Sequence, residues 1–143
     1  MSEKKPLQGH LDHKNGVVLI IEDDRLNMIL LRDILNASGI PTIETHNGER
    51  GLEMARIHQP ALVIMDIELE KLSGIALTQR MKMDSSIRAI PVIATSAHAP
   101  EFFEKASLEA GCAEFIAKPI NVREFVRTVK IYLGIDQEEE KIA

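Results

Sequence analysis

The sequence predicts an α/β fold, in which helices cover both faces of a doubly wound, five-stranded parallel sheet. Two observations support this prediction. Short apolar runs alternate with amphipathic helical patterns along most of the 143 residues. The run at residues 61–65 is apolar at every position, which is typical of a strand that is buried on both faces of a parallel sheet.

The first two strand–helix units end at clear stop signals. Residues 17–21 form the first apolar run, and the helical pattern at residues 26–35 ends before Gly39. Residues 42–45 form a short second strand, and the helix after it breaks at Pro60. Each unit is therefore expected to be one β-strand followed by one α-helix.

Three further units follow the same plan. The predicted strands are residues 61–65, 92–94 and 115–117, and the last helix runs through Leu133. The boundaries lie at residues that interrupt the pattern, namely Ser73, Pro91, Pro100, Gly111 and Pro119. Five such units with right-handed crossovers favour the flavodoxin-like (βα)5 arrangement with strand order 2-1-3-4-5.

Two tails flank the predicted domain, which spans residues 16–134. Residues 1–15 are polar and aperiodic and are predicted to be a flexible N-terminal tail, whereas residues 135–143 form an acidic C-terminal tail. Cys112 is the only cysteine in the sequence, so we expect it to be a packing residue and expect no intramolecular disulfide.

The net charge and the hydropathy of the sequence argue against several classes of function. The net charge of −5 and the isoelectric point near 5.5 argue against binding to nucleic acid or to an anionic membrane, because both need a dense basic patch. No apolar stretch approaches the roughly 20 residues of a membrane span, and the N-terminus lacks the apolar core of a signal peptide. We therefore expect a cytoplasmic protein.

Four of the apolar runs lead to side chains that handle phosphate or metal. The first run leads to Glu22, Asp23 and Asp24, the third to Asp66, the fourth to Thr95 and Ser96, and the fifth to Lys118. Ligand sites in open α/β sheets lie outside the carboxyl ends of the strands, so we expect these groups in one cleft. In the predicted strand order the first and third strands are neighbours, which brings Glu22, Asp23 and Asp66 together.

These groups favour metal-assisted phosphoryl transfer. Asp23 and Asp66, with Glu22 or Asp24 nearby, form an oxygen-only set that suits Mg²⁺. Asp66 is the best candidate for the nucleophile, because a carboxylate can form an acyl phosphate and Asp66 ends the central strand. Lys118 and Ser96 can each bind one phosphoryl oxygen. A single acidic residue after a strand is more often a helix N-cap, so the combination carries the prediction.

Residues 17–133 resemble the receiver domain of two-component response regulators. The motifs that carry the resemblance are Ile-Ile-Glu-Asp-Asp, Val-Ile-Met-Asp, Ala-Thr-Ser-Ala and Ile-Ala-Lys-Pro. The opening Glu-Asp-Asp-Arg-Leu-Asn-Met, at residues 22–28, and the short sequence after the last helix are similar to the DivK-type single-domain receivers. Receivers of hybrid histidine kinases share a similar opening. The resemblance implies a CheY-like fold.

The resemblance also implies a role for each acidic residue. Asp66 would accept a phosphoryl group from a sensor histidine kinase or a histidine phosphotransfer protein. Asp23 would bind Mg²⁺ directly, Glu22 would bind it through water, and the backbone carbonyl of Glu68 would complete the protein ligands.

Further residues would read the phosphorylated state. By the resemblance, Lys118 would bridge the carboxylate and the phosphate, and Ser96 rather than Thr95 would be the switch hydroxyl, because the small Ala97 follows it. Phe115 takes the aromatic switch position and would rotate inward when Ser96 moves toward the phosphate. The alternative for Phe115 is a plain core aromatic.

Three residues near Asp66 depart from the common pattern or vary within it. Glu70 stands where most receivers carry proline, which suggests a more mobile loop. Glu68 and His98 lie at the mouth of the predicted site, and we expect them to tune the lifetime of the acyl phosphate. The alternative for His98 is an ordinary loop histidine.

Phe102 and Phe103 are adjacent in a predicted helix and cannot both face the core. We expect at least one to be exposed, on a surface for a downstream protein target or for a weak, phosphorylation-dependent dimer of an otherwise monomeric protein. Packing against a neighbouring loop is the alternative.

The leading hypothesis is a signalling switch that acts by protein contact, without an output domain, and is not an enzyme beyond its own phosphorylation and dephosphorylation. One alternative is a receiver cut from a hybrid histidine kinase. Others are a degenerate receiver that only binds partners and an aspartate-nucleophile phosphatase of the haloacid-dehalogenase type, whose Asp-x-Asp motif would here have Glu68 as its second carboxylate. A flavodoxin is disfavoured, because no Ser/Thr/Gly-rich loop follows the first strand.

Overall fold

The computed structural model describes residues 16–98 and 100–135. Within these residues five parallel strands form one sheet in the order β2-β1-β3-β4-β5, which confirms the predicted order. The strands are β1 (Val18–Ile21), β2 (Thr42–Thr45), β3 (Leu62–Asp66), β4 (Val92–Ser96) and β5 (Glu114–Ala117). The tails predicted at residues 1–15 and 135–143 lie outside the described residues, apart from Ile135.

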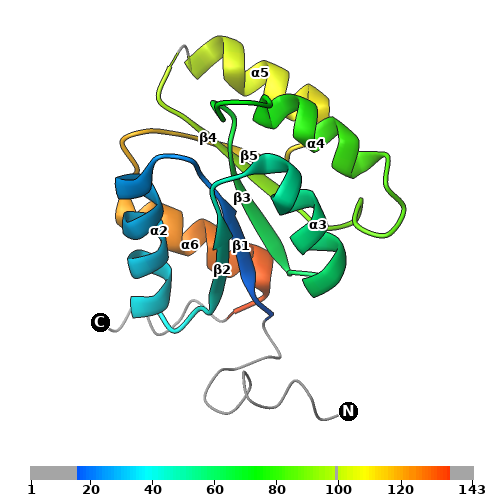
Figure 1. The fold of residues 1–143 in the computed structure, drawn as a ribbon. Helices are drawn as coiled ribbons and strands as arrows, with labels where there is room; N and C mark the ends of the chain where they lie inside the picture. Colours follow the sequence, from blue (N-terminus) through cyan, green and yellow to red (C-terminus); the bar gives the residue numbers. More distant parts are fainter. Residues whose placement is uncertain (1–15, 99, 136–143) are drawn as a thin grey trace, which may run out of the picture.

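Helices cover both faces of the sheet, as Figure 1 shows. One face carries α2 (Arg25–Ala37) and α6 (Val122–Leu133), and the other carries α3 (Gly48–His58), α4 (Gly74–Lys82) and α5 (Pro100–Ala110). No helix among the described residues is long and apolar enough to cross a bilayer.

Alternate residues of the central strands supply two separate cores. Val18, Ile20 and Ile64 pack with α2 and α6, whereas Val63 and Met65 pack with α3 and α4. All residues of β1, β3 and β4 are buried, which agrees with their apolar character on both faces. The sheet is therefore a rigid base for any group at its carboxyl edge.

The helices begin close after the strands because polar side chains cap them. Asp24 accepts a hydrogen bond from the backbone N–H of Asn27 at 2.9 Å, and Asn47 and Asn121 cap α3 and α6 in the same way. Asp24 is thus the N-cap of α2. Because all five strands are parallel, their carboxyl ends and the first turns of the helices lie at one edge of the sheet.

Cys112 is buried, as expected for a packing residue. Its thiol donates to the Thr78 hydroxyl at 3.6 Å, and burial raises the pKa of the thiol. Because the thiolate is the reactive form, burial makes this thiol less reactive than an exposed one.

Gly74 lets the loop after β3 fold back onto the strand. A Cβ atom at Gly74 would lie 2.5 Å from the carbonyl oxygen of Asp66 and 2.6 Å from the Cα atom of Ile67. Both contacts are with backbone, which cannot move aside cheaply. The backbone N–H of Gly74 also donates to the Ile67 carbonyl at 3.1 Å, so this approach closes the loop that carries Glu68 and Glu70.

The substitution Gly74→Ala is expected to lower the free energy of unfolding by about 1–3 kcal/mol, the usual cost of overpacking a tight site. Gly48→Ala is the matched control, since Gly48 also begins a helix and its Cβ would meet the flexible side chain of Leu77 at 3.2 Å. We expect the control to change stability by less than about 1 kcal/mol. Urea unfolding followed by circular dichroism checks this, and equal midpoints for the two variants would contradict it.

Candidate functional site

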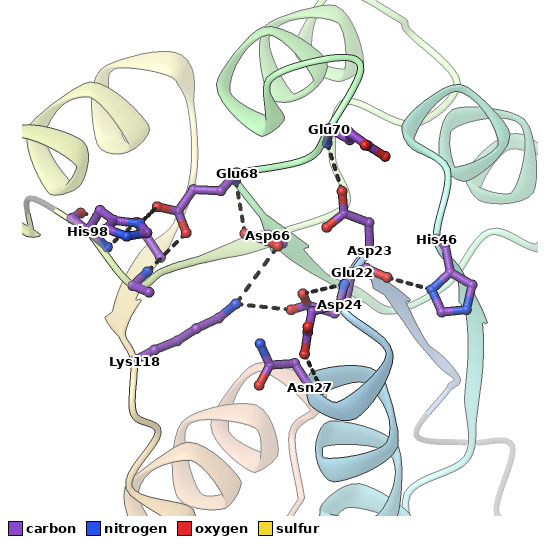
Figure 2. Close-up of polar contacts among 12 residues, drawn as sticks. Glu22, Asp23, Asp24, Asn27, His46, Asp66, Glu68, Glu70, His98 and Lys118 are labelled. Carbon is purple, nitrogen blue, oxygen red and sulfur yellow. Dashed lines mark hydrogen bonds and ion pairs between the residues drawn. The ribbon is translucent and has the colours of Figure 1, made fainter.

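Three carboxylates meet at the carboxyl edge of the sheet. Glu22 and Asp23 directly follow β1, and Asp66 is the last residue of β3, the neighbour of β1. One carboxylate oxygen from each lies within 4.8 Å of the others. The structure thus brings together the acidic residues that the sequence assigned to one site, as Figure 2 shows.

Burial makes this group of carboxylates electrostatically costly. Glu22 is 1% exposed and Asp66 is 4% exposed. Burial, and then the hydrogen bond to Asp66 and its negative charge, raise the pKa of Glu22 to about 7. The arrangement is therefore suited to a cation, and its oxygen-only donor set fits Mg²⁺.

Lys118 reaches across the site from the end of β5 (Figure 2). Its Nζ atom lies 3.2 Å from Glu22 Oε1 and 3.8 Å from Asp66 Oδ2. The Lys118 side chain is 13% exposed, so it is held in place rather than mobile. This ammonium partly compensates the charge of the two buried carboxylates.

Backbone N–H groups fix one oxygen of each carboxylate. The N–H of Asp24 donates to Glu22 at 3.1 Å, that of Glu68 donates to Asp66 at 2.9 Å, and that of Glu70 donates to Asp23 at 2.7 Å. Proline has no N–H, so the unusual Glu70 supplies a hydrogen bond that proline at this position could not make. The loop after β3 is thereby tied to the end of β1.

Ser96 and Thr95 end β4 next to Asp66, and both are buried. The Ser96 hydroxyl donates to the carbonyl of His98 at 3.1 Å and accepts from the His98 N–H at 3.2 Å. The Thr95 hydroxyl has no hydrogen-bond partner within the described part of the chain. The Ser96 hydroxyl is thus engaged by its own loop.

Glu68 and His98 form a contact across the mouth of the site. Glu68 Oε1 accepts from the backbone N–H of Ala97 at 3.1 Å, and Glu68 Oε2 contacts His98 Nδ1. Burial alone would raise the pKa of Glu68, but the hydrogen bonds from His98 and Ala97 outweigh it and lower the pKa. The Glu68 side chain therefore links the loops after β3 and β4 as a carboxylate.

The aromatic candidates lie outside the carboxylate cluster. Phe115 is half-buried and packs against the core on the α3–α4–α5 face. In α5, Phe102 is 67% exposed, whereas Phe103 is half-buried against the same core. The rings of Phe102 and Phe103 meet edge to face, with centroids 5.2 Å apart.

His46 is a further residue beside the site that was not predicted from the sequence. Its Nδ1 atom lies 2.9 Å from the carbonyl oxygen of Glu22, so it contacts the segment that carries two of the carboxylates (Figure 2). The signal was available, because His46 directly follows β2 and the carboxyl end of β2 borders that of β1.

Known proteins are similar to this chain in sequence and fold. Residues 18–130 match the family described as response regulator receiver domain. The polar-differentiation response regulator DivK of Brucella anthropi is 47% identical over 117 residues, which is 82% of this chain and 95% of that protein. DivK of Brucella ovis is 46% identical over the same length.

Solved structures agree with these matches. The signal receiver domain of a histidine kinase from Syntrophus aciditrophicus is 30% identical, with a TM-score of 0.77 over 83% of this chain and 90% of that one. The receiver domain of a sensor histidine kinase from Pseudomonas aeruginosa is 24% identical, with a TM-score of 0.77 over 83% and 98% of the two chains. That structure is described with a magnesium ion coordinated in its active-site cleft.

The raised pKa of Glu22 predicts a pH dependence of stability without metal. Its pKa rises from an ordinary value of 4.5 to about 7 on folding, so the folded state holds a proton that the unfolded state releases. Stability should therefore fall as the pH rises from 4.5 to about 7. The slope contributed by this one proton approaches about 1.4 kcal/mol per pH unit.

Glu22→Gln keeps the shape of the side chain and removes this titration. Urea unfolding of both proteins across that pH range, with a chelator present, isolates the contribution as the difference between the two slopes. Identical slopes in wild type and variant would show that Glu22 does not hold the proton.

Proposed function

The chain belongs to the response regulator receiver domain family, and on that premise we propose that Asp66 accepts a phosphoryl group from a phosphohistidine. The phosphohistidine belongs to a sensor histidine kinase or to a histidine phosphotransfer protein. The observation that best supports the proposal is the buried Asp66 carboxylate, which has two further carboxylates and the Lys118 ammonium around it.

The proposed step is a single displacement at phosphorus. An oxygen of Asp66 attacks the phosphorus atom, and the bond from phosphorus to the histidine nitrogen breaks as the new oxygen–phosphorus bond forms. The nitrogen leaves with the bonding electron pair and is protonated from solvent when required. Hydrolysis of the aspartyl phosphate by water returns the Asp66 carboxylate and inorganic phosphate.

The protein groups would position Asp66 and balance its charge. The backbone N–H of Glu68 holds Asp66 Oδ1, which leaves Oδ2, the oxygen nearer Lys118, for attack. In this proposal Lys118 then pairs with a phosphoryl oxygen, since its Nζ atom already lies 3.8 Å from Asp66 Oδ2.

We assign Mg²⁺ to this site. Asp23 and Asp66 would bind it directly, Glu22 through water, and the backbone carbonyl of Glu68 would complete the protein ligands. When bound, Mg²⁺ supplies positive charge that offsets the carboxylates and the phosphoryl oxygens. The fit of the donor set and the magnesium ion described for the Pseudomonas aeruginosa receiver support this assignment.

Phosphorylation of Asp66 would change which proteins the chain binds. The Ser96 hydroxyl would turn from its own loop to the phosphoryl group, and Phe115 would follow it inward. The face formed by α5, β5 and α6 would then bind a downstream protein target or a second copy of the chain, with the exposed Phe102 as a contact. We place this activity in the cytoplasm.

This proposal makes the protein a phosphoacceptor rather than a turnover enzyme, with Glu68 and His98 tuning the lifetime of the acyl phosphate. The phosphatase and flavodoxin alternatives lose support, because the family match covers residues 18–130. The chemistry proposed for Asp66 is the same in a single-domain receiver and in a receiver of a hybrid histidine kinase.

Incubation with acetyl phosphate and Mg²⁺ should add one phosphoryl group, detected by intact mass and mapped to Asp66 in tryptic peptides. Asp66→Asn should abolish the adduct. Asp24→Asn is the matched control and should retain it, because Asp24 caps α2 and Asn is an equally good cap. A stable adduct that persists in Asp66→Asn would refute the assignment.

Phe102→Ala should weaken phosphorylation-dependent self-association or target binding while leaving stability nearly unchanged, because Phe102 is 67% exposed. Ile57→Ala is the matched control, since Ile57 is also 67% exposed but lies on α3. Light scattering of the phosphorylated proteins, with target binding where a target is in hand, measures the effect. Wild-type behaviour of both Phe102→Ala and Phe103→Ala would remove the contact role.

A further inference from the structure

The end of β4 presents two hydrogen-bond donors toward the mouth of the site, and both are engaged. The backbone N–H of Ala97 donates to Glu68 Oε1 at 3.1 Å. The Ser96 hydroxyl donates to the carbonyl of His98 at 3.1 Å. Neither donor is available to a new anion unless a contact in this loop breaks.

Glu68 touches both sides of the site. Its backbone N–H donates to Asp66 Oδ1 at 2.9 Å. Its side chain accepts from the Ala97 N–H and extends to His98, which Figure 2 shows. The side chain of Glu68 is 25% exposed and that of His98 is 77% exposed. The contact therefore lies at the entrance, beside the Asp66 carboxylate.

A phosphoryl group on Asp66 would compete for the same donors. It adds a charge of about −1.5 to −2 and three acceptor oxygens. The carboxylate of Glu68 is already an anionic acceptor on the Ala97 N–H, and one N–H cannot make a full hydrogen bond to both. Like charges would also drive the carboxylate of Glu68 away from the phosphoryl group.

We propose that the Glu68 carboxylate competes with the phosphoryl group for the Ala97 N–H. His98 holds the Glu68 carboxylate on that N–H and so keeps the loop after β4 in its unphosphorylated arrangement. The proposal rests on the proposed function of Asp66. Phosphorylation must displace Glu68 before the Ala97 N–H can turn to a phosphoryl oxygen. We call this contact of Glu68 with Ala97 and His98 the Glu68–His98 latch.

The Glu68–His98 latch predicts how each substitution changes the rate of phosphorylation. Glu68→Ala removes both acceptor oxygens and keeps the backbone N–H that holds Asp66. His98→Ala removes the imidazole that steadies Glu68. Both should speed phosphorylation, and the double variant should gain nothing beyond Glu68→Ala, because the two residues act through one contact.

Glu70→Ala is the matched control for charge. Glu70 lies two residues further along the same loop, is exposed, and has its backbone N–H bonded to Asp23. This substitution removes the same negative charge and leaves the hydrogen bond between Ala97 and Glu68 in place. The difference between Glu68→Ala and Glu70→Ala therefore measures the latch itself.

The first measurement uses the full chain without phosphate. Amide hydrogen exchange followed by NMR should show the Ala97 N–H exchanging about 2- to 10-fold faster in Glu68→Ala than in Glu70→Ala, the factor that one hydrogen bond contributes. Equal exchange rates would show that Glu68 does not protect Ala97, and the latch would be refuted whatever Asp66 does.

The second measurement is the initial rate of adduct formation with acetyl phosphate and Mg²⁺, by intact mass. Glu68→Ala should be about 2- to 10-fold faster than Glu70→Ala. Equal rates, or additive gains in the double variant, would overturn the proposal while leaving Asp66 as the phosphoacceptor. If no variant takes up phosphate, the function proposed for Asp66 fails, and the latch fails as a regulator of it.

Discussion

The main constraint on this structure is that the fold holds three carboxylates close together, although they repel one another. Two of them, Glu22 and Asp66, are at most 4% exposed, so water screens them little. Neighbouring strands β1 and β3 bring them together, and the buried cores on both faces of the sheet stop them from moving apart. Protonation of Glu22, the ammonium of Lys118 and the proposed Mg²⁺ would each reduce the repulsion among these carboxylates.

The loop after β3 connects the carboxylate cluster to the rest of the molecule. Gly74 lets the loop return onto Asp66, and the N–H groups of Glu68 and Glu70 then hold Asp66 and Asp23. The side chain of Glu68 continues the connection to the loop after β4. These contacts form a continuous path from Asp66 to the segment that leads to α5 and its exposed Phe102.

Much of the fold and of the site could be predicted from the sequence, because both depend on hydrophobic periodicity and strand order. Apolar runs locate the strands to within a residue or two, and parallel pairing then forces Asp23, Asp66, Ser96 and Lys118 to one edge. Side-chain contacts between loops follow no such rule. Loop conformations, which hydropathy does not encode, determine three contacts of the site. These are the contact of Glu68 with Ala97, the hydrogen bond from the Glu70 N–H to Asp23, and the contact of His46 with Glu22.

Calorimetric titration with Mg²⁺ near neutral pH, in two buffers of different ionisation enthalpy, tests the central claim most directly. The account predicts one ion bound per chain, release of part of a proton as Glu22 ionises beside the metal, and much weaker binding in Asp23→Asn. No binding by the wild-type protein, or equal binding in Asp23→Asn, would contradict the claim that these carboxylates form a cation site.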